Sequence, residues 1–191
     1  MENPLVVLFE ITNAFDSLGI DYVVVGSIAS SIHGEFRASG DIDIVAQIQH
    51  EHVEPLVRTL ETHFYIDDLS VRRAIAHGRK FNVIHLSAIF KVDVFAASTS
   101  LGKQQLARRQ LYKLDPEIQE HVWVATAEDT ILAKLHWYRI GGEVSELQWR
   151  DVRGIIGTRG AQLDLGYLRR WAEREGLSDL LERALTESQH L

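Results

Sequence analysis

Hydrophobic and polar positions along the first two thirds of the chain follow the periods of both helices and strands. Val7, Leu8, Ile11, Phe15 and Leu18 recur at helical spacing and predict a helix near the start. Short β-branched or alternating runs predict strands at residues 22–25, 42–48, 81–86 and 89–95, the last two joined by a tight turn at 87–88. Helical patterns lie between them at residues 28–33 and 52–63. This mixture predicts an α/β core.

Two segments of the core allow more than one interpretation. Residues 72–76 fit a short helix or a loop. Residues 101–113 begin with a helical pattern, and their end could pair as a strand with residues 122–125.

The pattern changes after Thr126. This residue suits the N-cap of a helix, and the acidic residues Glu128 and Asp129 follow it in the first turn. Glycines separate helical patterns at residues 129–140, 143–158, 164–175 and 177–188. We therefore predict an α/β core over residues 1–126 and a helical C-terminal extension over residues 127–191, packed on that core.

Composition narrows the class of protein. With 191 residues, 46% hydrophobic and 25% charged, the chain is typical of a folded protein. It has no cysteine, which excludes disulfides and thiolate metal sites, and no apolar run reaches the roughly 20 residues that span a bilayer. Without a secretory signal pattern, we expect a cytoplasmic protein without a membrane segment. A net charge of −7 argues against a surface that is basic throughout, but not against a local basic groove.

Asp41 and Asp43 alternate with Ile42 and Ile44 in a predicted strand. Because alternate residues of a strand share a face, the two carboxylates project together while the isoleucines point into the core. Two adjacent carboxylates repel each other unless a cation lies between them, and oxygen ligands suit Mg²⁺ or Mn²⁺. The alternative is a pair of exposed acids on a half-buried strand.

Asp93 interrupts another apolar strand. A buried carboxylate needs a partner, so Asp93 would complete a three-carboxylate cluster if its strand lay beside that of Asp41 and Asp43. Alternatively, Asp93 faces water at an edge strand or pairs with Lys91, two residues away on the same face.

Gly26 and Ser27 lie where a predicted strand meets a predicted helix. Glycine lets a ligand approach the backbone closely, and a helix N-terminus offers free N–H groups to phosphate. The same residues also fit an ordinary turn.

Together these residues resemble the signature of the polymerase-β-like nucleotidyltransferase superfamily: Gly26-Ser27, thirteen intervening residues, Asp41-x-Asp43 and Asp93 on a later strand. The resemblance covers about residues 20–96. It implies a mixed β-sheet flanked by helices, two divalent metals (Mg²⁺ or Mn²⁺) held by the three aspartates, and triphosphate oxygens resting on Gly26-Ser27. It also implies a transferase that moves a nucleoside monophosphate from an NTP such as ATP to an acceptor, with Asp93 as candidate general base.

Further residues are similar to motifs of bacterial abortive-infection toxin-type and antibiotic-modifying nucleotidyltransferases. Arg37 follows His33-Gly34 and precedes Asp41, and Lys134 lies on a helix after the sheet. The resemblance implies that Arg37 contacts a nucleotide phosphate or the acceptor, and that Lys134 binds the triphosphate. Arg150-Asp151 matches a later motif in part, but Gly154 stands where an additional aspartate is common. All of these charges are also typical of solvated helix and loop surfaces.

Three classes of function remain open. The first is an NTP-dependent nucleotidyltransferase whose acceptor is RNA, a protein or a small molecule. The second is a catalytically silent module with this fold, such as one half of a toxin–antitoxin pair, with an antitoxin or a second copy of the chain as partner. The third is a carboxylate–metal hydrolase, for which the Gly-Ser spacing would be coincidental. Nine histidines do not by themselves form a zinc site, since His50 and His52 lack a third ligand.

Overall fold

The computed structural model describes residues 4–38, 40–115, 117 and 119–188, which form parts of two compact units. One unit comprises Met1–Val25 and Ser39–Val124, and the other Gly26–Ala38 and Ala125–Leu191. The division after residue 126 stays a prediction; the compact units differ from it by grouping Gly26–Ala38 with the C-terminal helices. Among the helices of the described residues, none combines the length and the apolar character needed to cross a membrane.

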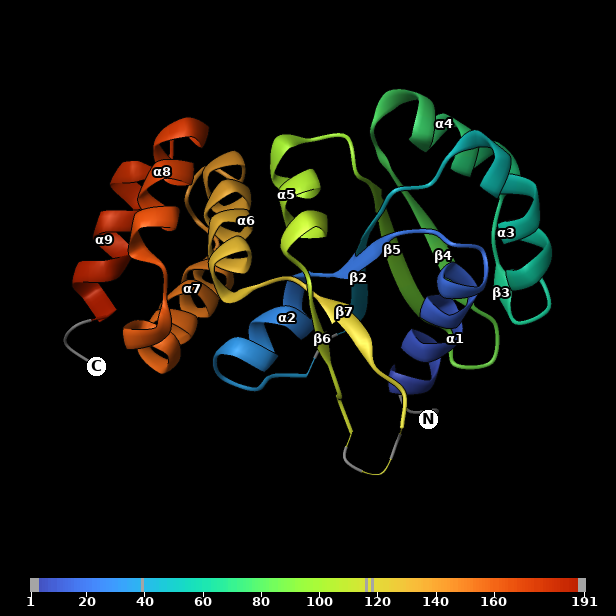
Figure 1. Ribbon diagram of the computed structural model, residues 1–191, viewed down its shortest axis with the longest axis horizontal. Coiled ribbons are helices and arrows are strands. Elements are labelled where there is room, and N and C mark those ends of the chain that lie inside the picture. Colours follow the sequence, from blue (N-terminus) through green and yellow to red (C-terminus); the bar gives the residue numbers. More distant parts are fainter. Residues whose placement is uncertain (1–3, 39, 116, 118, 189–191) are drawn as a thin grey trace. The chain divides into compact units, whose positions relative to one another are not determined.

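A mixed β-sheet forms the centre of the first unit, with strand order β3-β4-β5-β2-β1-β7-β6 (Figure 1). β2 runs parallel to β5 and β1 runs parallel to β7, whereas the other neighbours are antiparallel. The strands are β1 (Tyr22–Val24), β2 (Asp41–Ala46), β3 (Phe64–Tyr65), β4 (Lys80–His85), β5 (Phe90–Ala96), β6 (Gln110–Tyr112) and β7 (Val122–Val124). The predicted α/β class and mixed sheet are confirmed.

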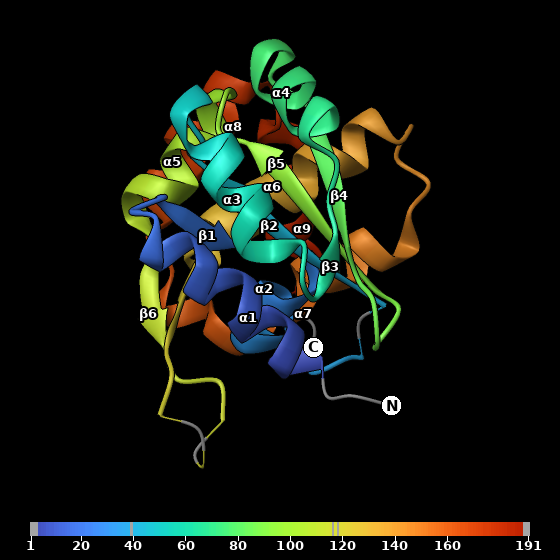
Figure 2. The ribbon, with the colours of Figure 1, turned by 90° about the vertical axis from the view of Figure 1, so that its right-hand side faces the viewer.

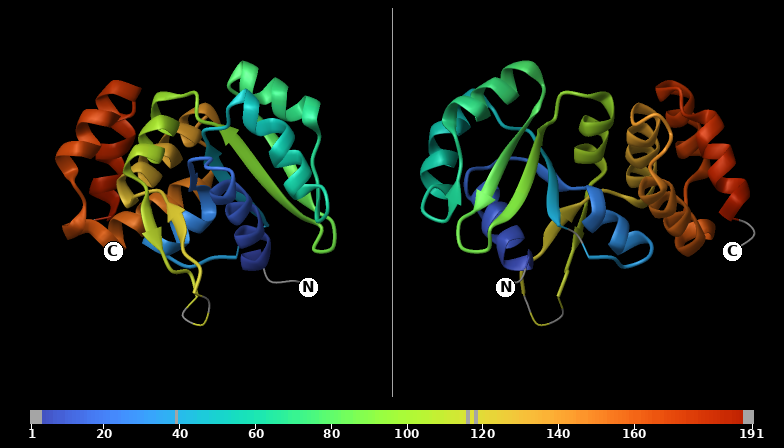
Figure 3. Two further views of the ribbon diagram at one scale, coloured as in Figure 1. Left: turned by 45° about the vertical axis from the view of Figure 1, so that its right-hand side comes forward. Right: turned by 180° about the vertical axis from the view of Figure 1, so that it is seen from behind.

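Helices of the same unit pack along this sheet: α1 (Pro4–Ser17), α3 (Val53–Leu60), α4 (Asp68–His77) and α5 (Ser100–Arg108), with a short 3₁₀ turn at His50–His52. α3 contacts both α1 and α4, and the views in Figures 2 and 3 show α1 and α3 side by side. The ring of Phe15 in α1 lies 5.7 Å from that of Tyr22. Since Tyr22 pairs with Ala46, it shares a face with Ile42 and Ile44, and α1 therefore covers that face.

The two ambiguous segments have definite structures. Residues 72–76 are part of the longer helix α4, which begins after Asp67, whose side chain accepts a hydrogen bond from the Ser70 amide at 2.7 Å. Residues 101–113 contain α5 and then β6, which pairs with β7 as the sequence suggested. β3 was not predicted, because two residues are too few to show a period.

The second unit is helical. Its helices are α2 (Gly26–His33), α6 (Ala127–Ile140), α7 (Glu146–Arg159), α8 (Leu165–Glu175) and α9 (Ser178–Ser188), with a 3₁₀ turn at Gly160–Gln162. α2 contacts α6 and α7, while α8 and α9 contact α6 and α7 respectively and each other. Fully buried apolar side chains of the unit include Ile131, Leu132, Leu135, Ile155, Leu168 and Leu181.

The starts of α2 and α7 are among those that differ from the predictions. α2 begins at Gly26 rather than after Ser27, and Gly26 has φ 62°, a left-handed value that glycine adopts without strain. α7 begins at Glu146 rather than residue 143, because Ser145 caps it by accepting from the Gln148 amide at 3.4 Å. Gly142 and Glu143 before it also have left-handed φ values of 74° and 61°.

Candidate active site

Asp41, Asp43 and Asp93 lie together in the first unit. Asp41 and Asp43 are half-buried in β2, while Ile42 and Ile44 between them are fully buried, as the alternation predicted. β5 lies directly beside β2, and Asp43 pairs with Asp93 in the parallel register. One carboxylate oxygen from each aspartate lies within 4.8 Å of the others. The three-carboxylate cluster required the strand of Asp93 to lie beside that of Asp41 and Asp43. The pairing of β5 with β2 meets this condition.

Two lysines also contact this cluster. Lys80 of β4 places Nζ 2.7 Å from Asp93 Oδ2, and Lys91 of β5 places Nζ 3.2 Å from the same oxygen. Lys91 also lies 3.7 Å from Asp41 Oδ2. The hydrogen bond to Asp93, together with the charges of Asp93, Asp41 and Asp43, raises the pKa of Lys91 above its ordinary value of 10.5. The pairing of Lys91 with Asp93 that the sequence left open is thus present, in addition to the cluster.

The sequence did not place Lys80 beside the carboxylates. Asn82 pairs with Asp93 across the β4–β5 hairpin, and Lys80 is two residues before Asn82 on the same face. Once the hairpin register is known, Lys80 falls beside the carboxylates. The sequence predicted both strands and their turn, but it did not determine which residues oppose each other.

The two oxygens of Asp93 have different environments. Oδ2 receives both lysines, whereas Oδ1 is buried and has no hydrogen-bond partner among the described residues. The residue as a whole is 4% exposed. A buried carboxylate oxygen without a partner is unfavourable, so this atom is suited to a cation. Three carboxylates with one such oxygen fit a hard divalent ion such as Mg²⁺ or Mn²⁺.

Gly26 and Ser27, at the start of α2, belong to the second unit. Ser27 is 4% exposed, and the Ser30 hydroxyl donates to the Gly26 carbonyl at 2.9 Å within the helix. The preceding residue, Val25, belongs to the first unit and donates its amide to the Asp43 carbonyl at 2.9 Å. The strand is therefore held to β2 up to the residue at which the chain leaves the sheet.

Arg37 and Lys134 meet at one carboxylate of the second unit, that of Asp151. The Arg37 guanidinium donates through Nε and Nη2 to the two Asp151 oxygens, each at 3.2 Å. Lys134 Nζ lies 2.9 Å from Asp151 Oδ2. The Lys134 side chain is 7% exposed and that of Arg37 is 20% exposed. Sequence reasoning matched Asp151 only in part to a motif, because no local pattern shows a contact between residues so far apart in the chain.

Two anchors hold the segment that carries Arg37. The buried ring of His33 bonds through Nε2 to the Ala125 carbonyl at 2.7 Å. At Gly34, an added Cβ would lie 2.9 Å from the Ile155 nitrogen, so α7 approaches the loop too closely for any side chain there. The first anchor holds the end of α2 to Ala125, just before α6, and the second holds the loop against α7.

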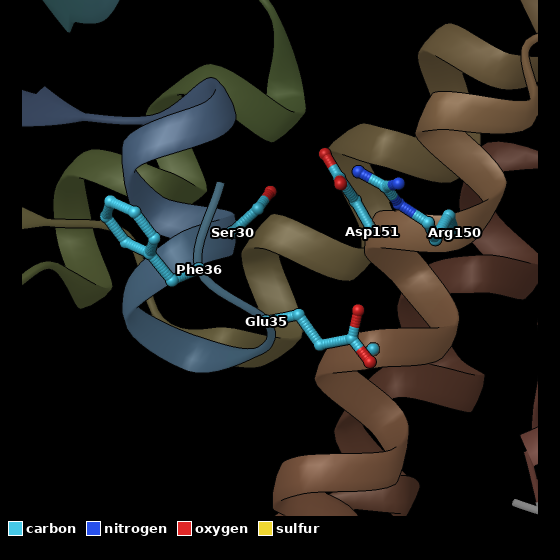
Figure 4. A pocket seen from close by; sticks show the side chains of 6 residues that line it. Ser30, Glu35, Phe36, Arg150 and Asp151 are labelled. Carbon is cyan, nitrogen blue, oxygen red and sulfur yellow. The ribbon is translucent and has the colours of Figure 1, made fainter. Parts of the chain in front are cut away.

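A small pocket of about 110 Å³ opens next to Asp151, lined by Ser30, Glu35, Phe36, Arg150, Asp151 and Gly154. In Figure 4, Ser30 of α2 and Asp151 of α7 point toward each other across it, whereas the Phe36 ring points away from α7. Phe36 is 88% exposed. Pockets that enclose a nucleotide-sized ligand hold roughly 300 Å³ or more, so this pocket alone is too small for one.

Comparisons with known proteins bear on the fold. No family model matches the sequence. A leucine–tRNA ligase from Halobacterium salinarum is 25% identical in an alignment of 149 residues that covers 73% of this chain but only 16% of that protein. The chain thus spans a small part of this relative.

Solved structures resemble the chain over most of its length. A nucleotidyltransferase-like protein from Paracoccidioides brasiliensis has a TM-score of 0.54 at 17% identity, covering 94% of this chain and 91% of that one. ANT(2″)-Ia, described in complex with adenylyl-2″-tobramycin, has a TM-score of 0.56 at 14% identity, covering 90% and 97%. Its solution structure, described as an antibiotic-resistance factor, has a TM-score of 0.55 at 16% identity, covering 94% and 96%. The fold of this chain is that of the polymerase-β-like nucleotidyltransferases.

Proposed function

We propose that the chain is a metal-dependent nucleotidyltransferase, which moves a nucleoside monophosphate from an NTP to an acceptor. One observation carries the proposal: in a nucleotidyltransferase fold, three carboxylates converge within 4.8 Å, and one of them has a buried oxygen with no hydrogen-bond partner among the described residues. A fold alone does not define a function, but this arrangement at the centre of the sheet supports a metal-binding role for the three aspartates.

Asp41, Asp43 and Asp93 would hold Mg²⁺ or Mn²⁺. Bound divalent ions supply positive charge that stabilises in-line displacement at phosphorus. The acceptor oxygen would attack the α-phosphorus, the bond between the α-phosphorus and the bridging oxygen would break, and pyrophosphate would leave. Asp93 is also the candidate general base for the acceptor proton, through the oxygen that does not hold the ion.

The nucleotide would be bound by Gly26, Ser27, Arg37 and Lys134. The N-terminal amides of α2 suit a phosphate, and Gly26 keeps the backbone open to it. Two cations share the single Asp151 carboxylate, which leaves an excess of positive charge. Arg37 is the more exposed of the two and is the candidate for direct phosphate contact, while the buried Lys134 would contribute mainly through its charge.

The acceptor remains one of three classes: RNA, a protein side chain or a small hydroxylated molecule. The third class includes antibiotics, because ANT(2″)-Ia shares the fold and is described in complex with an adenylylated tobramycin. A cytoplasmic location and a partner such as an antitoxin or a second copy also stay predictions. Incubating the protein and Mg²⁺ or Mn²⁺ with each labelled NTP and with RNA, protein and metabolite fractions would show which class accepts the label.

The isosteric variants Asp41→Asn, Asp43→Asn and Asp93→Asn test the site. Each should lower nucleotide transfer by roughly 100-fold or more, because the charge that holds the divalent ions is removed. Glu51→Gln is a matched control, since it removes one exposed carboxylate elsewhere in the same unit and should leave transfer unchanged. Thermal melting checks that every variant is folded. If transfer survives in any of the three aspartate variants, the site assignment is wrong.

A second candidate function is a catalytically silent interaction module. The observation in its favour is that Lys80 and Lys91 already pair with the cluster, so the carboxylates have cations without any metal. Calorimetry distinguishes the two functions. The enzyme should bind at least one of the four NTPs only with a divalent metal present, whereas an absence of binding to all four with either metal would favour the silent module.

A further inference from the structure

Lys80 and Lys91 bring two positive charges to a cluster of three carboxylates, and both are directed at one atom, Asp93 Oδ2. The three carboxylates alone carry a charge of −3. Together with the two lysines, the five groups carry a net charge of −1. Lys91 also reaches Asp41, so its ammonium group spans two of the three aspartates. The arrangement resembles the one that a bound cation would impose on the same oxygens.

The lysines are placed by the sheet and not by chance surface encounters. β4 and β5 form a continuous antiparallel ladder, which sets Lys80 opposite Phe95 and Lys91 opposite Ile84. Lys80 Nζ also lies 5.6 Å from the centre of the Phe95 ring, a second favourable position for an ammonium group near the cluster. Both side chains remain nearly half exposed, at 47% and 42%, so each can move away from Asp93 without disrupting the core.

An ion that binds through Asp93 Oδ1 finds an oxygen free of hydrogen bonds to the described residues, but the nearby ammonium groups repel it. When a triphosphate is bound to that ion, the lysines attract the complex instead of repelling it. Its negative charge attracts the same lysines and offers them oxygens in exchange for Asp93 Oδ2. Positive side chains beside a carboxylate cluster should therefore weaken binding of a free metal ion and favour a metal ion that arrives with a triphosphate.

We infer that Lys80 and Lys91 are specificity-determining residues that discriminate against free divalent ions and favour the metal–triphosphate complex. The inference rests on the proposed function, since it requires the aspartates to be metal ligands. It assigns the lysines a role in substrate binding that a purely structural ion pair would not have.

Direct binding measurements on the full chain test the inference. Mn²⁺ binding is followed by electron paramagnetic resonance, alone and with a non-hydrolysable ATP, CTP, GTP or UTP analogue, whichever binds wild type best. Lys80→Met and Lys91→Met should each bind free Mn²⁺ several-fold more tightly than wild type and should bind the Mn²⁺–analogue complex several-fold more weakly. Lys91→Arg keeps the charge and should retain the weak binding of free Mn²⁺. Lys103→Met, an exposed position on α5, removes an equal charge and should change neither affinity.

Failure of the inference and failure of the proposed function give different results. If Asp93→Asn abolishes Mn²⁺ binding but the lysine variants bind free Mn²⁺ no more tightly than wild type, the metal centre stands and the role of the lysines is wrong. The same conclusion follows if Lys103→Met has the same effect as Lys91→Met. If wild type and Asp93→Asn bind Mn²⁺ equally, or neither binds it with or without an analogue, the metal centre itself is wrong and the inference falls with it.

Discussion

His33 lies at the end of α2, buried, with Nε2 2.7 Å from the Ala125 carbonyl. Because a carbonyl can only accept a hydrogen bond, Nε2 carries the proton of the ring. Burial lowers the pKa of His33 below its ordinary value of 6.5, and the positive charge of Arg159 acts in the same direction. The Ala125 hydrogen bond and Glu128 oppose this shift without cancelling it. The folded protein therefore favours the neutral form of His33.

The lowered pKa predicts a loss of stability in mild acid. Below about pH 6.5 the unfolded chain gains a proton on His33 that the folded chain does not, so the free energy of unfolding falls as the pH falls toward the folded-state pKa. The slope from this group is at most about 1.4 kcal/mol per pH unit, and above pH 6.5 the contribution is constant. Urea unfolding of wild type and His33→Gln at pH 5 to 8 measures it. The stability difference between them should depend on pH only below 6.5, and a constant difference would contradict the prediction.

The individual residues of the site differ in how far the sequence could reveal them. The prediction of Asp41 and Asp43 rests on strand alternation, on their spacing from Gly26-Ser27 and on the family resemblance. The assignment of Asp93 to the cluster required its strand to lie beside that of Asp41 and Asp43. The order of elements favoured this arrangement, and the parallel register of β2 and β5 confirms it. Lys80 and Asp151 depend on hairpin register and on helix packing, and neither leaves a local signal. Sequence therefore indicated the carboxylates and the pairing of Lys91 with Asp93, but not the contact of Lys80 with Asp93 or those of Arg37 and Lys134 with Asp151.

The loop after α2 is an element whose conformation depends on a close approach to α7. An added Cβ on Gly34 would meet the Ile155 nitrogen at 2.9 Å and the Gly154 carbonyl carbon at 3.0 Å. Both atoms belong to the backbone of a helix, so they cannot move aside as a flexible side chain would. Three residues further along, Arg37 forms its two hydrogen bonds to Asp151 of the same helix. The contact at Gly34 thus sets the distance across which Arg37 must reach.

Gly34→Ala should destabilise the protein by roughly 1–3 kcal/mol, because the loop must shift away from α7. Gly157→Ala is the matched control: it adds the same methyl group to an exposed position of α7 with nothing within 4 Å, and should be neutral or stabilise by up to about 1 kcal/mol. Urea unfolding measures both. Equal effects of the two substitutions would show that the close approach at Gly34 carries no energetic weight.

Helices and strands were predicted correctly where a local sequence pattern, such as periodicity or a helix cap, determines them. Periodicity placed α1, β4, β5 and α6, and the cap at Thr126 marked the start of α6, where its hydroxyl accepts from the Asp129 amide at 3.2 Å. β3 was too short to detect. Pairing partners, helix contacts and the grouping of α2 with the C-terminal helices result from tertiary packing, which no short window of sequence contains.

At the scale of the whole molecule, the chain passes between the two units after Val25, after Ala38 and after Val124. The helical unit is therefore discontinuous in sequence. α2 contributes the buried residues Ala29, Ser30 and His33 to it, and the loop after α2 contributes one of the two cations on Asp151. A boundary after residue 126 would separate these parts from the helices that they contact.

We expect a fragment of residues 125–191 to be poorly folded by itself, since it lacks the apolar contacts of α2 and the His33 and Arg37 hydrogen bonds. Joining residues 26–38 to residue 125 by a flexible glycine-serine linker should restore a cooperative transition and raise the free energy of unfolding by about 2 kcal/mol or more. A fusion with the sequence of residues 26–38 scrambled controls for the added length. Thermal and urea unfolding by circular dichroism compare the three proteins. Equal stability of the fragment and the native fusion would show that the C-terminal helices fold without α2 and would favour the boundary after residue 126.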